Sequence, residues 1–206
     1  MKNTKQEISQ LLLSKEAVKI NLNELFRWSS GILSPIYCDN RKMLSFPKER
    51  SIIVEAFCKK ISELNQKVNC IAGVATGGIA WGILVAEKLN LPFVYVRPEP
   101  KKHGLGNQIE GFLPQKSSVI VIEDLISTGA SSLNACLALK NQNAHVQYLI
   151  SIFEYGFSEA KMNFQKHQIP YSSLTDFHTF IQISDFSDEQ KEWLINWIKN
   201  PSKTFS

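Results

Sequence analysis

Residues 119–122 constrain the fold more than any other stretch, because they are β-branched residues with no polar residue between them. A strand with one face in water alternates apolar and polar residues, whereas an unbroken apolar strand is buried on both faces. Strands of that kind occur in parallel sheets that helices cover on both sides. The run therefore predicts an α/β protein with a central parallel sheet flanked by helices.

Two carboxylates and a segment of small residues follow this run. Glu123 and Asp124 are placed at the carboxyl end of the predicted strand, where open α/β sheets bind their ligands. Residues 127–132 are small and mostly hydroxylic, and residues 133–140 have the pattern of a helix. Backbone N–H groups at a helix start lack partners within the helix, so small residues there let a phosphate come close. The order of these segments predicts a phosphate site.

The carboxylates indicate which phosphate compound the site binds. The stretch contains neither Gly-x-x-x-x-Gly-Lys-Ser/Thr, which a nucleoside triphosphate site requires, nor Gly-x-Gly-x-x-Gly, which a dinucleotide site requires. Carboxylates accept hydrogen bonds from ribose hydroxyls, so the pattern suits a ribose 5-phosphate. A buried strand followed by a capped helix without any ligand is the alternative interpretation.

Residues 119–132 resemble the phosphoribosyl pyrophosphate signature of the type I phosphoribosyltransferases. The resemblance implies the fold of that family, with a small N-terminal hood and a mobile catalytic loop beside the central sheet. It implies that Asp124 is a catalytic residue. It also implies that phosphoribosyl pyrophosphate contacts the following residues of the signature: Glu123, Asp124, Leu125, Ile126, Ser127, Thr128, Gly129, Ala130 and Ser131.

Residues 26–41 are rich in aromatic side chains and are interrupted by Ser-Ser-Gly and Ser-Pro. The pattern predicts a hairpin, either a lid that offers stacking partners to a flat heteroaromatic base or a hairpin with a packed Trp and no ligand. The segment resembles the amino-terminal hood of the orotate phosphoribosyltransferases, where a Ser-Gly-x-x-Ser-Pro-x-Tyr stretch helps to bind the pyrimidine. The resemblance implies that Ser30, Tyr37 and Ser127 contact orotate. Leu33 stands where many relatives carry a lysine, so no role of that lysine is carried over.

A second unit of strand, tight turn and helix is predicted at residues 70–89. Its Ala-Thr-Gly-Gly turn, residues 75–78, is either purely structural or offers backbone amides to a diphosphate. In the family this turn meets the pyrophosphate, which implies contacts at Thr76 and Gly77.

Residues 98–111 have basic residues, glycines and prolines but almost no apolar periodicity. A loop of this length inside a compact domain is usually functional or disordered, and a solvated loop without function is the alternative. Arg97, Lys101 and His103 resemble the mobile catalytic loop of the family, in a pattern close to Arg-x-x-x-Lys-x-His-Gly. The resemblance implies that all three contact phosphoribosyl pyrophosphate, with Lys101 and His103 as catalytic residues that commonly come from the neighbouring subunit of a homodimer. Pro98 replaces a lysine that some members have.

The rest of the sequence predicts further helices and strands. Glu154 stands in a region where some relatives hold a base-binding arginine. Residues 187–190 read as a capping box before a C-terminal helix. Helices are predicted at residues 7–19, 48–65, 158–167 and 175–183, and strands at residues 91–96, 145–153 and 170–174.

Composition limits the domain count and the compartment. With 206 residues and 44% hydrophobic content, the chain predicts a single domain over residues 1–206, its hood contributed mainly by residues 20–45 and the C-terminal segment. The net charge of +4 is scattered along the chain, which favours small anionic ligands over nucleic acid. Without an apolar signal core or a stretch near the ~20 apolar residues of a membrane span, a cytoplasmic protein with no membrane partner is expected. The cysteines are predicted to be free thiols: Cys38, Cys58, Cys70 and Cys136.

The resemblance as a whole implies an orotate phosphoribosyltransferase activity. Such an enzyme converts orotate and phosphoribosyl pyrophosphate to orotidine 5-phosphate and pyrophosphate in pyrimidine (UMP) synthesis, with Mg²⁺ as a cofactor held mainly by the substrate and not by direct protein ligands. Two alternatives stay open. One is a type I phosphoribosyltransferase acting on a purine or on uracil, which only the hood argues against. The other is a non-catalytic regulator that senses phosphoribosyl pyrophosphate, against which the intact Lys101 and His103 argue.

Overall fold

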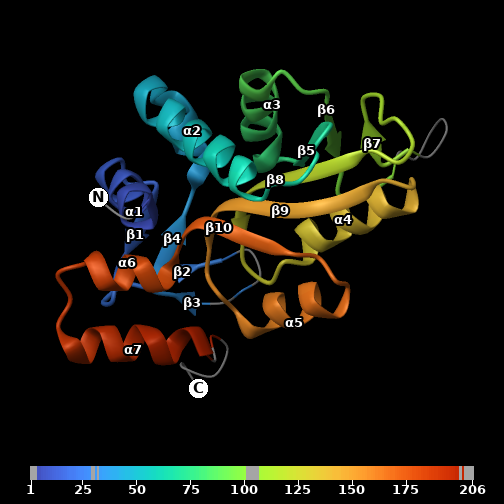
Figure 1. Cartoon of the computed structure of the whole chain (residues 1–206). Coiled ribbons are helices and arrows are strands. Elements are labelled where there is room, and N and C mark those ends of the chain that lie inside the picture. Colours follow the sequence, from blue (N-terminus) through green and yellow to red (C-terminus); the bar gives the residue numbers. More distant parts are fainter. Residues whose placement is uncertain (1–3, 29–30, 32, 101–106, 200, 202–206) are drawn as a thin grey trace.

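A six-stranded sheet forms the middle layer of the molecule in a computed structural model that describes residues 4–28, 31, 33–100, 107–199 and 201 (Figure 1). Its order is β10-β9-β8-β5-β6-β7. Neighbouring strands are parallel except β7, which pairs antiparallel with β6 at one edge. The strands are β5 (Cys70–Val74), β6 (Phe93–Val96), β7 (Ile109–Glu110), β8 (Ser118–Ile126), β9 (His145–Glu154) and β10 (Tyr171–Asp176). The predicted central parallel sheet is confirmed, but β7 occupies part of the segment for which no regular structure is predicted.

Helices cover both faces of the sheet. α2 (Pro47–Glu63) and α3 (Gly77–Leu89) lie on one face, and α4 (Ala130–Asn141) and α5 (Ser158–Lys166) lie on the other (Figure 1). Along β8, Ile120 and Ile122 belong to the buried cluster under α2 and α3, whereas Val119 and Val121 belong to the cluster under α4 and α5. The prediction of a strand buried on both faces is therefore confirmed.

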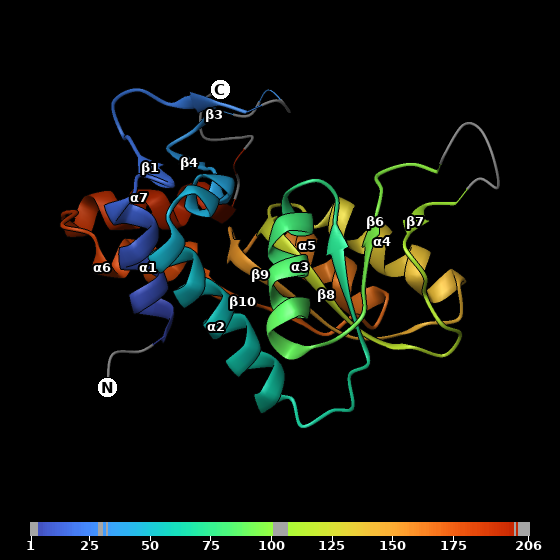
Figure 2. The ribbon, with the colours of Figure 1, turned by 90° about the horizontal axis from the view of Figure 1, so that it is seen from above.

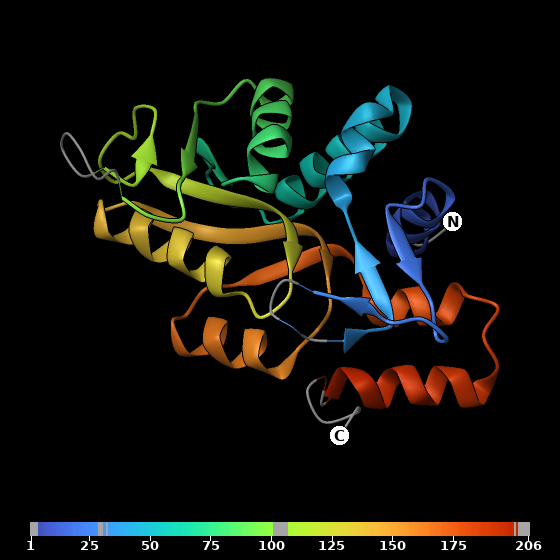
Figure 3. The same cartoon turned by 180° about the vertical axis from the view of Figure 1, so that it is seen from behind.

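The hood, taken as the described residues between 18 and 45, stands at one side of the sheet. β1 (Val18–Ile20) pairs antiparallel with β4 (Ile36–Cys38), and β2 (Phe26–Arg27) pairs antiparallel with β3 (Leu33–Ser34). β4 leads through the 3₁₀ helix η1 (Asn40–Ser45) into α2 (Figure 3). The helices α1 (Thr4–Ser14), α6 (Phe177–Ile183) and α7 (Asp188–Lys199) gather with the hood strands, on the side opposite β6 and β7 (Figure 2).

The helix predicted over residues 7–19 is wrong at its end. α1 stops at Ser14, and Glu16 adopts a left-handed conformation with φ 52° that ends the helix. Val18 and its neighbours then pair with β4, opposite Cys38. The backbone hydrogen bonds of this antiparallel ladder replace those of a further helical turn, so tertiary pairing overrides the local apolar spacing.

An aromatic cluster joins the hood to the C-terminal helix. The ring of Trp28 lies 4.7 Å from that of Tyr155 and 6.1 Å, edge on, from that of Trp197. Trp197 is fully buried, and its indole N–H donates to the carbonyl of Leu33 at 3.3 Å. The predicted capping box is confirmed, because Ser187 and Gln190 exchange hydrogen bonds between side chain and backbone at the start of α7. α7 thus holds the hood in place although it is far away in sequence.

The other predicted helices and strands are present with ends that shift by up to about three residues. All of the cysteines are free thiols, as predicted. None of the described helices has both the length and the apolar content that a membrane-spanning helix requires.

Asp176 ties the sheet to two helices, and its replacement is expected to destabilise the fold. Its carboxylate accepts hydrogen bonds from the backbone N–H and the hydroxyl of Thr179, both at 2.8 Å, and pairs with Lys5 of α1. Asp176→Ala removes this N-cap, which should lower the free energy of unfolding in urea by about 1–2 kcal/mol at pH 7. Asp185→Ala, at an exposed carboxylate, is the matched control. An equal loss in both variants would contradict the assignment.

The effect should depend on pH. Burial opposes ionisation of Asp176, but Lys5 and Thr179 outweigh it and lower the pKa of this carboxyl. An acid whose pKa is lowered by folding stabilises the protein above its unfolded pKa and loses that effect as pH falls. The difference between wild type and Asp176→Ala should therefore shrink when unfolding is measured below about pH 4.

Candidate active site

The two signature carboxylates lie within β8 and not beyond its end. β5 pairs with β8 only as far as Gly73 opposite Ile122, but β9 continues to pair with β8 as far as Glu154 opposite Ile126. The predicted strand end at Ile122 is therefore wrong, because β9 extends the ladder on one side. On the other side, Glu123 and Asp124 run past the end of β5 next to the start of α3.

Two glycines let α3 approach this part of β8. A Cβ atom on Gly77 would lie 2.1 Å from Oδ2 of Asp124, and one on Gly78 would lie 2.4 Å from the carbonyl oxygen of Ile122. No larger residue fits at either position without moving the helix. The preceding Ala75–Thr76 peptide bond is cis. Since no side-chain cap is formed at Thr76, the first N–H groups of α3 are available next to Asp124.

A third glycine shapes the start of α4. Gly129 is the N-cap residue with φ 77°, and a Cβ atom there would lie 2.8 Å from the ring of Phe164 on α5. α4 begins at Ala130, earlier than the predicted start at residue 133, so Ser131 and Ser132 belong to its first turn. No side chain caps this helix among the described residues. The loop and first turn thus form the anion-binding start of a helix that the signature predicts.

Glu123 and Asp124 point to opposite faces of the sheet. Glu123 is 4% exposed and accepts hydrogen bonds from the hydroxyl of Ser132 at 2.9 Å and from the N–H of Asp124 at 3.0 Å. Burial, and then the neighbouring charge of Asp124, raise the pKa of Glu123 well above its ordinary value. Asp124 is half-buried and lies against Gly77 on the side of α3. One strand therefore supplies a carboxylate to each of the two helix starts.

Both carboxylates face a cavity of about 320 Å³ between the hood and the two helix starts. Four hood residues that the sequence did not mark as site residues complete the site: Cys38, Asp39, Asn40 and Arg41. Asn40 is 1% exposed and donates to the carbonyl of Asp124 at 2.7 Å, and Arg41 Nε donates to Asp39 at 2.9 Å. The polar residues that directly follow β4 were the sequence feature that could have indicated three of them. The cavity is lined by Cys38, Asp39, Arg41, Ala75, Thr76, Gly77, Glu123, Asp124, Leu125 and Ser131.

The donor set limits the chemistry of the cavity. Burial, and then the charges of Asp124 and Asp39, raise the pKa of the Cys38 thiol well above its ordinary value, which argues against a thiolate nucleophile. Within the described part of the chain, no group of three His, Cys, Asp or Glu side chains could hold a metal ion by itself. The carboxylates suit a hard cation such as Mg²⁺, which keeps several waters and binds one or two carboxylates together with phosphate oxygens.

The remaining predicted residues are distributed around the cavity or away from it. Thr76, Gly77, Leu125 and Ser131 line it, and Ser127 and Thr128 are half-buried in the loop before α4. Tyr37 is 43% exposed, with its ring 5.7 Å from that of Phe26. Three residues lie outside the described part of the chain: Ser30, Lys101 and His103.

Arg97 and Pro98 hold the near end of the predicted catalytic loop. Arg97 Nη1 lies 3.3 Å from a carboxylate oxygen of Glu110 on β7. The carbonyl of Pro98 accepts a hydrogen bond from Asn134 of α4 at 3.0 Å. The base of the loop is thus tied to both the sheet edge and the signature helix.

Glu154 belongs to a different environment. It ends β9 opposite Asp176, and burial, followed by the charge of Asp176, raises its pKa. It is not among the residues that line the cavity. The base-binding arginine that some relatives hold in this region therefore has no counterpart in Glu154.

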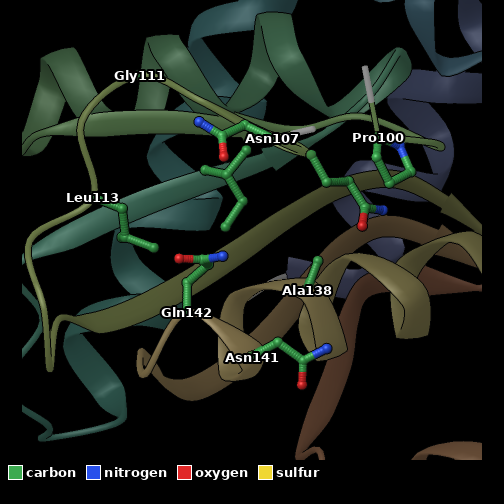
Figure 4. A pocket seen from close by; sticks show the side chains of 9 residues that line it. Pro100, Asn107, Gly111, Leu113, Ala138, Asn141 and Gln142 are labelled. Carbon is green, nitrogen blue, oxygen red and sulfur yellow. The ribbon is translucent and has the colours of Figure 1, made fainter. Parts of the chain in front are cut away.

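A second cavity, of about 390 Å³, lies between the segment around β7 and the end of α4 (Figure 4). Among the described residues, its lining includes Asn107, Gln108, Asn141 and Gln142 and no charged side chain. The described part of this lining offers hydrogen bonds but no positive charge that would attract a multiply charged phosphate compound. The cavity next to Asp124 is the candidate active site.

Comparison with known proteins agrees with this geometry. Residues 43–168 match the model of the phosphoribosyl transferase domain. The orotate phosphoribosyltransferase of Bacillus subtilis (strain 168) is 46% identical, covering 96% of this chain and 93% of that protein. That of Porphyromonas gingivalis is 46% identical and covers 98% of each chain. The crystal structure of orotate phosphoribosyltransferase from Aeropyrum pernix has a TM-score of 0.75 at 27% identity, covering 85% of this chain and 96% of that one.

Glu123→Gln is expected to stabilise the protein in the absence of ligands. An acid whose pKa is raised by folding favours the folded state below its unfolded pKa, and this contribution is lost as pH rises through the folded pKa. The neutral amide avoids that loss, so the variant should exceed wild type in free energy of unfolding at pH 8 by on the order of 1 kcal/mol. The difference should shrink towards pH 4. Glu24→Gln, at an exposed carboxylate, should leave stability unchanged at both pH values; a Glu123→Gln protein less stable than wild type at pH 8 would refute the argument.

Proposed function

The chain belongs to the orotate phosphoribosyltransferases of the phosphoribosyltransferase family, and we propose that the cavity at Asp124 is where it transfers the phosphoribosyl group from phosphoribosyl pyrophosphate to orotate. The products are orotidine 5-phosphate and pyrophosphate, in UMP synthesis. The observation that carries the site assignment is the convergence of two uncapped helix starts on the carboxylates of one strand. An anion can bind at each helix start while the ribose between them meets the carboxylates.

Each part of the substrate has a matching surface. The 5-phosphate binds to the start of α4, through the N–H groups and hydroxyls of residues 127–131. The ribose hydroxyls donate hydrogen bonds to Glu123 and Asp124. The diphosphate lies at the start of α3, against Thr76 and Gly77. Orotate lies under the hood, in contact with Ser30, Tyr37 and Ser127.

Displacement at the anomeric carbon builds positive charge on the ribose and negative charge on the departing pyrophosphate. The bond from the anomeric carbon to the pyrophosphate oxygen breaks, and N1 of orotate forms the new bond. Asp124 stabilises the cationic ribose, because a fixed, half-buried charge acts more strongly than one in bulk solvent. Arg97, Lys101 and His103 neutralise the leaving group. Orotate ionises readily at N1, so this chain needs no strong base.

We propose that Mg²⁺ is the divalent cation used, held mainly by the hydroxyl and phosphate oxygens of the substrate. It neutralises charge on the diphosphate when bound. Asp124 is the described side chain best placed to contact it or its waters, because the carboxylate faces both the ribose and the start of α3.

Orotate is favoured over a purine or uracil because the similarity to orotate phosphoribosyltransferases extends through the hood. We further propose that the protein is a single-domain cytoplasmic enzyme and acts as a homodimer in which Lys101 and His103 close over the site of the partner subunit.

The function is tested by following orotate loss with Mg²⁺ and phosphoribosyl pyrophosphate, in parallel with uracil, adenine, guanine and hypoxanthine. Orotate alone should be consumed. Asp124→Asn should reduce turnover by about 10²- to 10³-fold with an unchanged unfolding transition, because a preorganised charge is lost in the transition state. Consumption of another base in preference to orotate would refute the assignment, and binding of phosphoribosyl pyrophosphate without pyrophosphate release from any base would indicate a regulator.

Sharing of sites between subunits is tested by mixing two inactive variants. Lys101→Ala and Asp124→Asn homodimers should each be nearly inactive. In a mixed dimer, one of the two sites combines the intact Asp124 of one chain with the intact Lys101 of the other. Since random mixing makes about half of the dimers mixed, co-refolding should restore about a quarter of wild-type activity.

The control for this experiment is a chain that carries both lesions, co-refolded with Lys101→Ala. No site in that mixture has both residues intact, so it should stay inactive. Recovery in the control would point to an artefact of refolding. If mixed dimers are present but remain inactive, the loop serves its own chain.

A further inference from the structure

Charge in the candidate active site is unevenly distributed. Among the described residues that line the cavity there are three carboxylates, Asp39, Glu123 and Asp124, and one cation, Arg41. A substrate with a 5-phosphate and a diphosphate brings several negative charges into this space. Carboxylates a few ångströms away would repel the diphosphate unless a nearby cation offsets them. Arg41 is the described lining residue that can do so.

The hood places Arg41 at this point by a short and well-anchored route. Asn40, the first residue of η1, is buried and donates to the carbonyl of Asp124 at 2.7 Å. Arg41 follows directly, so its backbone is fixed to the signature strand through its neighbour. η1 also contacts α3, whose first residue, Gly77, lines the same cavity.

The guanidinium of Arg41 is oriented by one hydrogen bond and keeps further donors for a ligand. Its Nε donates to Oδ1 of Asp39 at 2.9 Å, and its side chain is 60% exposed. An arginine has five N–H donors in a planar fork, so the donors of the two terminal nitrogens remain for a ligand after the Nε contact. That fork matches phosphate oxygens in a bidentate manner, and it stays charged at every working pH.

We propose that Arg41 is a substrate-binding residue that clamps the diphosphate of phosphoribosyl pyrophosphate against the start of α3. This inference rests on the proposed function and assigns to the hood a part in binding the leaving group. The helix start offers N–H groups from one side, and Arg41 offers a charged fork from the other. As the bond to the anomeric carbon breaks, charge on the pyrophosphate grows and the contact strengthens, so Arg41 acts in the transition state as well as in binding.

Lys42 provides a matched control on the same 3₁₀ helix. It is also a cation and follows Arg41 directly, but its Nζ lies 3.6 Å from Glu16 and it does not line the cavity. Removing it changes the net charge of the hood by the same amount. A difference between the two positions therefore reports the placement of the charge and not its presence.

The test compares Arg41→Ala, Arg41→Lys and Lys42→Ala with wild type. Inorganic pyrophosphate with Mg²⁺ is titrated into each protein by calorimetry, and KM is measured separately for phosphoribosyl pyrophosphate and orotate. Losing a charge-assisted hydrogen bond should raise the Kd of pyrophosphate and the KM of phosphoribosyl pyrophosphate by about 10- to 100-fold in Arg41→Ala. The KM of orotate should change by less than about 3-fold. Arg41→Lys should fall between, and Lys42→Ala should match wild type.

Three outcomes would overturn the assignment. Unchanged pyrophosphate binding in Arg41→Ala is one, and an equal loss in Lys42→Ala is another. A rise in the KM of orotate with that of phosphoribosyl pyrophosphate unchanged is the third, since it would place Arg41 at the base. Urea unfolding of each variant shows whether a loss reflects misfolding, and Arg41→Lys keeps the test open if Arg41→Ala does not fold.

The pyrophosphate titration separates this inference from the proposed function. A wild-type protein that binds pyrophosphate through Arg41 but does not consume orotate would refute the function and keep the binding residue. An active wild-type enzyme in which Arg41→Ala binds and turns over normally would refute the binding residue alone.

Discussion

The close contact between α3 and the backbone of β8 is the constraint on which the site depends. Gly77 and Gly78 bring the start of α3 so near to the strand that a Cβ at Gly77 would overlap the carboxylate of Asp124. Because side chains alternate along a strand, Glu123 then faces α4 and Asp124 faces α3. Two helix starts on opposite faces of the sheet are thereby served by adjacent carboxylates. The proposal that one strand organises a substrate with phosphate groups on both sides of its ribose rests on this arrangement.

The hood is held over this centre from two directions. Near the cavity, Asn40 bonds to the backbone of Asp124. Farther out, Trp28 packs among aromatic rings that include Tyr155 at the end of β9 and Trp197 of α7. The C-terminal helix is therefore part of the support of the hood and not a surface addition. Trp197 also contacts the hood directly, because its indole N–H bonds to the backbone of β3.

The buried carboxylate of Glu123 lowers the stability of the free protein. Burial of Glu123 beside Asp124 disfavours its ionised form, and the thiol of Cys38 is subject to the same desolvation and charges. In the free protein an ionised, buried Glu123 raises the energy of the folded state. The role proposed for Arg41 rests on the same electrostatics, since carboxylates repel an anion unless a cation faces it.

The central strand and the helix start with small residues that follows it could be predicted from the sequence alone, because the apolar run, the carboxylates and the small residues are contiguous. The capping box of α7 could be predicted because its residues are also contiguous. Contacts between distant segments could not be predicted from the sequence. The pairing of Val18 with β4 ended a predicted helix, Asn40 met Asp124 across 84 residues, and Glu154 came to lie beside Asp176. These placements depend on packing that brings separate segments together, and such packing leaves no periodic pattern in any one of them.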